Sequence, residues 1–438
     1  MVEASKLRTE TLALHAGQTR DPRNGAQAVP IYQTNAYVYE DTEQAASLNN
    51  LEIGGHLYSR ISNPTVAAAE ERIAALEGGV GALGLSSGHA AVFLTIATLL
   101  SAGDHIVATK ALYGGSINLM KLTLPRFGIT TTFVDGSDID AIRAAIQPNT
   151  RMIFGEVVGN PRLDVLDVAA VAGVAQEAGL PLVVDSTFTP PPLYRPFEDG
   201  ANIVIHSATK WIGGHGIAMG GFIVDAGNFD WASSDKFPTL TEPYPGYPGM
   251  TYAEHFGPSA FLARARTEGL RDFGTVLSAQ SAFYLIQGME TLSLRMERHI
   301  ANARAVLDFL ANDEAVAWVR HPDMPDHRDH EVAKRQLPEG ATSMIVFGVK
   351  GGFEAGKALI NSARLASHVS NVGDAKTLLV HPASTTHMQL GPEQRKLAGV
   401  PDDMIRLSVG IEHVDDIIDD LRASLRTSQR AVAGDAKG

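Results

Sequence analysis

Two stretches decide the fold: Leu180-Pro181-Leu182-Val183-Val184-Asp185-Ser186-Thr187 and Ile203-Val204-Ile205-His206-Ser207-Ala208-Thr209-Lys210. Each begins with a short run of Leu, Val and Ile and ends in polar residues. A near-continuous apolar run indicates a strand that is buried on both faces, as in a parallel sheet covered by helices. The carboxyl end of such a strand borders the ligand crevice of an open α/β sheet. We therefore expect Asp185 to point into a crevice, and Lys210 follows a strand of the same kind.

Further apolar runs flank these two, and helical patterns separate them. The expected strands are Gly81–Leu85, His105–Thr109, Thr130–Val134, Met152–Val158, Leu180–Asp185, Ile203–His206 and Phe222–Val224, and the expected helices are Ala90–Leu100, Ile139–Ile146 and Val165–Ala178. Short strands that alternate with helices predict a large α/β domain with a mostly parallel sheet. We place this domain at residues 61–272.

The segments on either side of this domain have different patterns. Residues 1–60 are predicted to form an N-terminal arm, because Arg8 to Asp41 is rich in Gly, Pro, Gln, Asn and Tyr without a sustained period. Arms of this kind often cross to another subunit. Asn63-Pro64, followed by periodic apolar residues and closed by Gly78, predicts a capped helix.

Residues 273–438 are predicted to hold a linking helix and a smaller C-terminal α/β domain. Phe273 to Leu310 is strongly helical, with an expected interruption at Gly288. The expected strands that follow are Met344–Val349 and Ile405–Val409, and the expected helices are Phe353–Ser362 and Val414–Leu425. Trp231 to Pro258, before the linking helix, is dense in Pro, Gly and Tyr. A structureless loop of this length is either an active-site wall or a surface insertion.

Composition excludes several classes of protein. The 438 residues contain no cysteine, which rules out disulfides, cysteine-ligated metals and a catalytic thiol. The formal net charge of −13 argues against broad binding to nucleic acid or to an anionic membrane. The first residues lack an apolar signal region, and the longest apolar run, Ala90 to Leu100, is too short to span a bilayer. We expect a cytoplasmic enzyme.

Lys210 and Asp185 together indicate the chemistry. A lysine amine beyond a buried strand can lose its proton through desolvation and neighbouring cations, as a Schiff-base lysine must. Most lysines at the end of a strand simply extend into solvent. The presence of Asp185 at the end of a similar strand favours the Schiff-base interpretation here. A buried carboxylate needs a cation opposite it, and the protonated pyridine nitrogen of pyridoxal 5′-phosphate (PLP) would serve.

A third motif, Gly84-Leu85-Ser86-Ser87-Gly88-His89, joins an expected strand to an expected helix. Backbone N–H groups at the helix N-terminus suit a phosphate, and Ser207 and Thr209 add hydroxyl groups. The same letters match the G-x-S-x-G elbow of α/β-hydrolases, with Ser86 as the nucleophile. That alternative leaves Lys210 and Asp185 unexplained. No nicotinamide or nucleotide motif follows a strand.

A stretch rich in His and Asp, from His321 to His330, looks metal-like. Its spacing matches no zinc motif and it contains two prolines, so a solvated loop is the better interpretation. We assign no metal.

Together these residues resemble the Cys/Met-metabolism family of PLP enzymes (fold type I), over nearly the whole chain. Ile203 through His215 matches the lysine signature of the family. Other matching blocks are Tyr58-Ser59-Arg60-Ile61-Ser62-Asn63-Pro64-Thr65, Tyr113-Gly114-Gly115, Gly159-Asn160-Pro161 and Arg406-Leu407-Ser408-Val409-Gly410-Ile411-Glu412.

The resemblance implies a role for each matching residue. Lys210 would carry PLP and move protons, Asp185 would keep the pyridine nitrogen protonated, and Tyr113 would stack on the ring. Arg406 would clamp the substrate carboxylate as a bidentate fork. The cofactor-binding set implied is Tyr58, Arg60, Ser87, Gly88, His89, Tyr113, Asn160, Asp185, Thr187, Ser207, Thr209 and Lys210, and the substrate-binding set is Arg406, Asn160, Ser370 and Tyr58.

The resemblance also implies a reaction and an assembly. The reaction is a γ-replacement in which sulfide or a thiol displaces acetate from O-acetyl-L-homoserine. Related alternatives in the family are cystathionine γ-synthase and methionine or cystathionine γ-lyase. The assembly implied is a homotetramer in which Tyr58 and Arg60 reach the active site of a neighbouring subunit. Because the protein has no thiol of its own, sulfur would arrive as a free nucleophile or on a donor.

Overall fold

A seven-stranded sheet forms the centre of the larger part of the molecule. In this computed structural model, the described residues are 7–435 except 22, 248, 387, 390, 392, 394 and 396–398. The sheet order is β1-β7-β6-β5-β4-β2-β3. Its strands are β1 Gly81–Leu85, β2 His105–Thr109, β3 Thr130–Val134, β4 Thr150–Glu156, β5 Leu182–Asp185, β6 Ile203–His206 and β7 Gly221–Asp225. Only β7 runs antiparallel to its neighbours, so the prediction of a mostly parallel sheet is confirmed.

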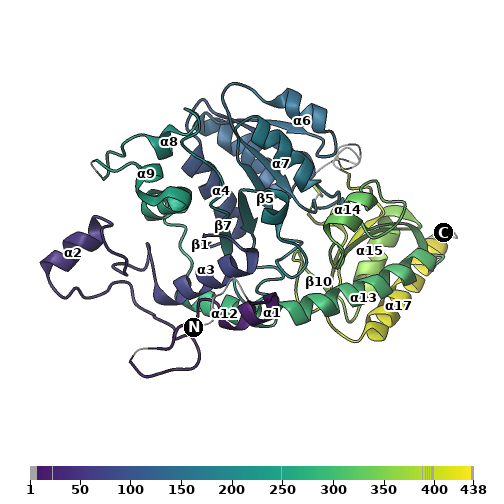
Figure 1. Ribbon diagram of the computed structural model, residues 1–438. Helices are drawn as coiled ribbons and strands as arrows, with labels where there is room; N and C mark the ends of the chain where they lie inside the picture. Colours follow the sequence, from purple (N-terminus) through teal and green to yellow (C-terminus); the bar gives the residue numbers. More distant parts are fainter. Residues whose placement is uncertain are drawn as a thin grey trace.

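Helices cover both faces of this sheet, which explains its continuous apolar strands (Figure 1). Ile203, Val204 and Ile205 of β6 are all fully buried, and they alternate between two apolar cores on opposite faces. The helices of this part are α3 Pro64–Glu77, α4 Gly88–Leu99, α5 Gly114–Asn118, α6 Ile139–Ala145, α7 Val168–Glu177, α10 Ala260–Arg264, α11 Arg271–Phe273 and α12 Ala279–Glu290. When both faces of a strand are buried, its sequence need not alternate between apolar and polar residues.

The capped helix expected after Asn63 is α3. The Asn63 side chain accepts a hydrogen bond from the Thr65 N–H, Pro64 occupies the first turn, and Gly78 ends the helix with a φ of 81°. A left-handed residue at this position is strained for any side chain but costs glycine little. Residues at its own ends therefore determine where α3 begins and where it ends.

The C-terminal part contains a second sheet, of order β10-β11-β12-β9-β8. Its strands are β8 Val316–Arg320, β9 Met344–Val349, β10 Ser367–His368, β11 Leu378–Val380 and β12 Met404–Ser408, and its helices are α13 Leu292–Asn312, α14 His330–Gln336, α15 Gly352–Ser362 and α17 Val414–Asp435. Figure 1 shows α13 running from the larger part toward this second sheet. The expected smaller α/β unit is therefore present, while the domain boundaries stay a prediction.

The break in the linking helix falls at Thr291, so the interruption expected at Gly288 is wrong. Gly288 lies inside α12, where the helix presses against the backbone of the segment after Lys210. A Cβ added at Gly288 would lie 2.3 Å from the Ile212 carbonyl oxygen. This glycine therefore permits a close approach of two backbones and does not end a helix.

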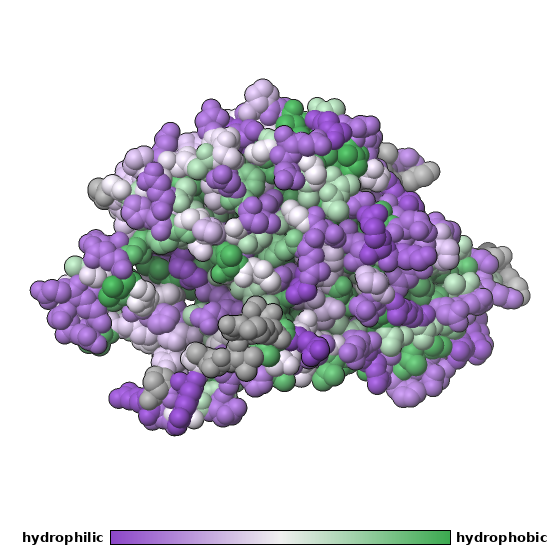
Figure 2. Space-filling view, in the orientation of Figure 1, coloured by the Kyte–Doolittle hydropathy of each residue, from purple (hydrophilic) through white to green (hydrophobic). Residues whose placement is uncertain are grey.

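Two segments expected to lack regular structure contain short helices. The arm includes α1 Thr9–His15 and α2 Thr42–Asn49, and the Pro/Gly/Tyr segment includes α8 Pro238–Thr241 and α9 Tyr252–Phe256. In Figure 1, α2 projects from the body of the molecule. Figure 2 shows a hollow between this arm and the body, with hydrophobic residues beside it. No helix of the described residues is long and apolar enough to cross a membrane.

Candidate active site

Lys210 lies in the turn that follows β6, at the carboxyl edge of the large sheet. Its Nζ donates a hydrogen bond to Asn371 Oδ1 at 2.6 Å. Burial, and then the positive charge of Arg406, lower the pKa of the Lys210 amine. Both effects disfavour the ammonium form, so the position favours an amine that can act as a nucleophile or base.

Asp185 ends β5, next to the strand that precedes Lys210. Its Oδ1 accepts a hydrogen bond from the Thr187 N–H at 2.9 Å, and burial raises the pKa of its carboxyl group. Thr187 and the more distant His206 and His89 oppose this effect of burial, and no ion pair within 4 Å is found for Asp185 among the described residues. A buried carboxyl group at the crevice edge suits the protonated pyridine nitrogen of PLP.

Glu156 is a site residue that the sequence analysis missed. It ends β4 and is the register partner of Asp185 in the neighbouring strand. Its carboxylate accepts hydrogen bonds from the Tyr113 N–H at 2.6 Å and the Asn160 N–H at 3.2 Å. Burial, and then the charge of Asp185, raise the pKa of Glu156 well above its usual range. The missed signal was an apolar strand ending in a carboxylate, the same pattern that marked Asp185.

Tyr113 directly precedes α5, at the carboxyl edge of the large sheet. The side chain is 55% exposed, and its ring folds over Gly115. A Cβ added at Gly115 would lie 2.4 Å from Tyr113 Cε1, which explains the glycine in the Tyr113-Gly114-Gly115 motif. An exposed aromatic face held in this way can stack on a planar ring.

The N-terminus of α4 meets the ends of β6 and β7 very closely. A Cβ at Gly88 would lie 2.6 Å from Ser207 Cβ, and a Cβ at Gly221 would lie 2.2 Å from the Ser87 carbonyl oxygen. The Ser87 side chain caps α4 by accepting the Ala90 N–H at 3.1 Å. The first helical N–H groups and the Ser207 hydroxyl therefore share one small space, which fits a phosphate.

Thr187, Thr209 and His89 lie on the segments beside this space, after β5, after β6 and in the first turn of α4. Thr187 Oγ1 accepts the Ser207 N–H at 2.8 Å and so ties β5 to β6. Thr209 Oγ1 exchanges hydrogen bonds with the backbone of Gly220. Burial lowers the pKa of His89, and the nearby Asp185 opposes that effect. All three residues therefore come from segments at the carboxyl edge of the large sheet.

Arg406 enters the site from β12 of the second sheet and contacts Asn160. Its Nη1 donates to Asn160 Oδ1 at 3.0 Å, while its Nε is buried and has no hydrogen-bond partner among the described residues. Burial lowers the pKa of Arg406 to about 10. A buried guanidinium group with a free N–H suits a substrate carboxylate. Ser370 is exposed and adjacent to Asn371.

Tyr58 and Arg60 lie on the arm, apart from this group. The guanidinium of Arg60 lies over the Tyr58 ring at 5.5 Å and donates to the Arg271 carbonyl oxygen. Within the described part of the chain, neither side chain has a hydrogen bond with Lys210, Asp185 or Ser207. Their predicted role in another subunit's site stays a prediction.

The hydrolase alternative needs a base beside Ser86. Ser86 lies on the β1–α4 turn, and its backbone N–H bonds the Thr275 carbonyl oxygen at 3.0 Å. Among the hydrogen bonds of the described residues, none joins the Ser86 hydroxyl to a histidine. The geometry of this turn therefore offers no activated serine.

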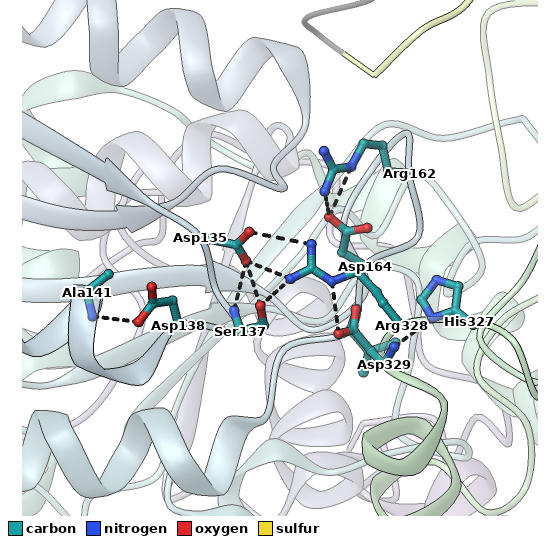
Figure 3. A network of polar contacts seen from close by, with 10 residues as sticks. Asp135, Ser137, Asp138, Ala141, Arg162, Asp164, His327, Arg328 and Asp329 are labelled. Carbon is teal, nitrogen blue, oxygen red and sulfur yellow. Dashed lines mark hydrogen bonds and ion pairs between the residues drawn. The ribbon is translucent and has the colours of Figure 1, made fainter.

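A separate polar network joins the two parts of the molecule (Figure 3). One ligand atom each of Asp164, His327 and Asp329 lies within 4.8 Å of the others, but Arg162 pairs with Asp164 and Arg328 pairs with Asp329. These arginines already supply positive charge to the carboxylates. The network borders a surface cleft of about 700 Å³ whose lining contains neither Lys210 nor Asp185. The assignment of no metal stays a prediction.

The fold and the crevice define an α/β enzyme with a lysine and a buried carboxyl group at the carboxyl edge of a mostly parallel sheet, an arrangement into which PLP fits. Residues 10–426 match the family described as Cys/Met metabolism PLP-dependent enzyme, and the chain belongs to this family. Its cofactor is PLP. When bound, PLP withdraws electrons from the substrate carbon attached to its imine nitrogen.

Named relatives match nearly the whole chain. A homocysteine synthase of Schizosaccharomyces pombe is 49% identical over 96% of this chain and 98% of its own. An O-acetyl-L-homoserine sulfhydrylase of Leptospira meyeri is 47% identical, covering 95% and 96% of the two chains. The crystal structure of a candidate O-acetylhomoserine (thiol)-lyase of Campylobacter jejuni has a TM-score of 0.92 and 34% identity, covering 96% and 100%. That structure contains N′-pyridoxyl-lysine-5′-monophosphate.

Proposed function

We infer that this protein is a PLP-dependent O-acetylhomoserine sulfhydrylase, which converts O-acetyl-L-homoserine and sulfide into L-homocysteine and acetate. The observation that carries the inference is the buried Arg406–Asn160 pair beside Lys210, in a chain 47–49% identical to enzymes of that name. The predicted γ-replacement is confirmed by the relatives of that name, which match nearly the full length of the chain. Sulfide is the acceptor in this proposal.

The proposed roles follow from the contacts of each side chain. Arg406 holds the α-carboxylate through N–H groups that include Nε, and Asn160 fixes the guanidinium plane. Lys210, whose pKa is lowered, accepts a proton from the substrate Cα as a neutral amine and returns it later. Asp185 holds a proton on the pyridine nitrogen, and Tyr113 covers one face of the ring.

The assay that tests the reaction follows acetate and homocysteine together. With purified holoenzyme, acetate release should require both O-acetyl-L-homoserine and sulfide, in equal amounts with homocysteine. Lys210→Ala should abolish the visible absorbance band and turnover. Retention of the band in that variant would contradict the assignment of the lysine, and a colourless wild-type protein that PLP does not change would contradict the proposal.

The family alternatives give different products. A γ-lyase would release 2-oxobutanoate and ammonia without any acceptor, and a cystathionine γ-synthase would prefer cysteine over sulfide. Running the three acceptors in competition separates these possibilities. Labelling of Ser86 by a fluorophosphonate would instead support the hydrolase alternative, which the geometry of Ser86 and the family do not favour.

We propose a homotetramer in the cytoplasm, with active sites shared between subunits. Support comes from the projecting arm, on which Val38 is 99% exposed and Tyr39 and Tyr58 are partly exposed. Apolar groups on an arm that leaves its own body suit burial against another copy. Sedimentation velocity of the wild type and of an Arg60→Ala variant tests the assembly, and PLP titration of the same two proteins tests the shared site. The variant should keep its assembly while binding PLP more weakly.

A further inference from the structure

Asn371 is the hydrogen-bond partner of Lys210 Nζ, and neither the sequence analysis nor the proposed reaction gives it a role. The Nζ–Oδ1 distance is 2.6 Å, and Asn371 is partly buried. It follows β10 and therefore comes from the C-terminal part of the chain, whereas Lys210 follows β6 of the large sheet. One hydrogen bond thus joins the reacting amine to the other part of the molecule.

The backbone beside Asn371 is fixed from two sides. The Gly373 N–H donates to Ser408 Oγ at 2.9 Å, and Ser408 lies two residues after Arg406 on β12. Gly373 has a φ of 75°, and a Cβ there would lie 2.7 Å from the ring and backbone of Trp211. Trp211 is the residue after Lys210 and is fully buried. These contacts therefore fix the backbone next to Asn371 relative to the segments that carry Lys210 and Arg406.

An amide oxygen is well suited to this position because it accepts a hydrogen bond without carrying charge. Burial and Arg406 disfavour the ammonium form of Lys210, and Asn371 does not reverse their effect. Arg406 is the charged group that acts on this amine, and Tyr113 in turn acts on Arg406. A neutral amine that donates one N–H to Asn371 has its lone pair directed elsewhere.

We propose that Asn371 is a positioning residue for Lys210: its Oδ1 holds the ε-amine whenever the amine is not bonded to the cofactor and so aims the lone pair at the substrate. The inference rests on the proposed function. In the step that it serves, the Cα–H bond of the substrate breaks, the proton passes to Nζ, and the electron pair stays with the substrate carbon. Asn371 keeps its hydrogen bond in both protonation states of the amine.

The test compares Asn371→Asp, which adds a charge at constant shape, and Asn371→Leu, which removes the acceptor. Asn361→Leu, at an exposed asparagine of α15, is the matched control. The first measurement is the rate at which the cofactor-free full-length protein regains its visible band with added PLP, from pH 6 to pH 9. The second is kcat and KM for O-acetyl-L-homoserine with saturating sulfide.

The Asp variant should move the midpoint of the reconstitution profile up by roughly one pH unit or more, because a carboxylate stabilises the ammonium form. The Leu variant should lose about tenfold in kcat, the size of one positioned hydrogen bond, with little change in KM. An unchanged midpoint in the isosteric Asp variant would overturn the proposal, and so would a wild-type kcat in a Leu variant that binds PLP.

The two proposals fail in different ways. If the wild type does not convert O-acetyl-L-homoserine but the Asp variant still shifts the reconstitution profile, the reaction is wrong and the Asn371–Lys210 contact stands. If the wild type is active and the profile does not move, the proposed function stands and the role of Asn371 is wrong. The Asp variant keeps the test decisive even if the Leu variant does not fold.

Discussion

Glu156 and Asp185 are register partners at the carboxyl ends of the adjacent parallel strands β4 and β5, and both carboxyl groups are buried. Two ionised carboxyl groups on neighbouring strand ends repel each other, and burial also disfavours the charged form of each. Each carboxyl group can therefore ionise only where a cation or a hydrogen-bond donor stabilises its negative charge. Asp185 would obtain its compensation from a pyridinium nitrogen, whereas Glu156 obtains it from two backbone N–H groups.

The first prediction concerns Glu156→Gln. A carboxylate can accept from the Tyr113 and Asn160 N–H groups at once, whereas an amide offers one oxygen and turns its NH₂ toward the other donor. A buried N–H without a partner costs about 1–3 kcal/mol, so kcat/KM should fall by roughly tenfold to a hundredfold. Steady-state kinetics and PLP titration measure the effect.

The control for this prediction is Glu354→Gln, on the exposed side of α15, which should leave kcat/KM unchanged. Equal kinetics for Glu156→Gln and wild type would show that Glu156 does not hold Tyr113 and Asn160 in their working positions.

The second prediction concerns the close packing at the start of α4. In Gly88→Ala, the new Cβ would lie 2.6–3.0 Å from atoms of Ser207, so the helix N-terminus must move away from the predicted phosphate position. We expect the dissociation constant of PLP to rise at least tenfold. Gly173→Ala is the matched control, because Gly173 lies in α7 and no atom of the described residues comes within 4 Å of the added Cβ. That variant should keep PLP affinity and gain up to about 1 kcal/mol of stability. Equal PLP affinity in both variants would contradict the predicted phosphate site.

The sequence was informative where local chemistry decides the structure. Asn63, Pro64 and Gly78 bounded α3 because caps act within a few residues, and β6 was recognisable because both of its faces are buried. By contrast, Gly288 was misinterpreted because its reason, the backbone of Ile212 and Gly213, lies far away in the chain.

The same distinction holds for the site. Lys210 and Asp185 each end an apolar run and could be found one strand at a time. Asn371 could not, because its significance depends on a contact across 161 positions of the sequence. The short strands β10 and β11, with two and three residues, likewise carry too little pattern to be seen without their partners.

The third prediction concerns Arg406→Lys. Lysine keeps the positive charge but loses both the planar fork and the Nη1 contact with Asn160. KM for O-acetyl-L-homoserine should rise about tenfold or more, while the visible band of bound PLP stays. Arg364→Lys, at an exposed position, should behave as wild type. A KM that is unchanged in Arg406→Lys would place the carboxylate site elsewhere.

The last prediction concerns pH and His299, which joins α13 to the end of β12. His299 is fully buried, and its Nδ1 makes a 2.7 Å hydrogen bond with the Val409 carbonyl oxygen, for which Nδ1 must carry hydrogen. Its Nε2 is buried and has no hydrogen-bond partner in the part of the chain that the structure describes, and burial lowers the pKa of His299 to about 4 from 6.5. The folded protein therefore binds fewer protons than the unfolded chain between these two values.

Stability consequently falls as the pH drops from about 6.5 toward 4. At pH 5 the contribution lost is about 2 kcal/mol relative to pH 7.5. His299→Gln removes the titration while its amide can still donate to Val409, so its unfolding free energy should depend less on pH over this range. His413→Gln, at an exposed histidine, should keep the wild-type slope. Urea unfolding at pH 5 and pH 7.5 measures both. If His299→Gln keeps the full slope, the acid sensitivity arises elsewhere, because a buried neutral imidazole is the only part of this contact that titrates in that window.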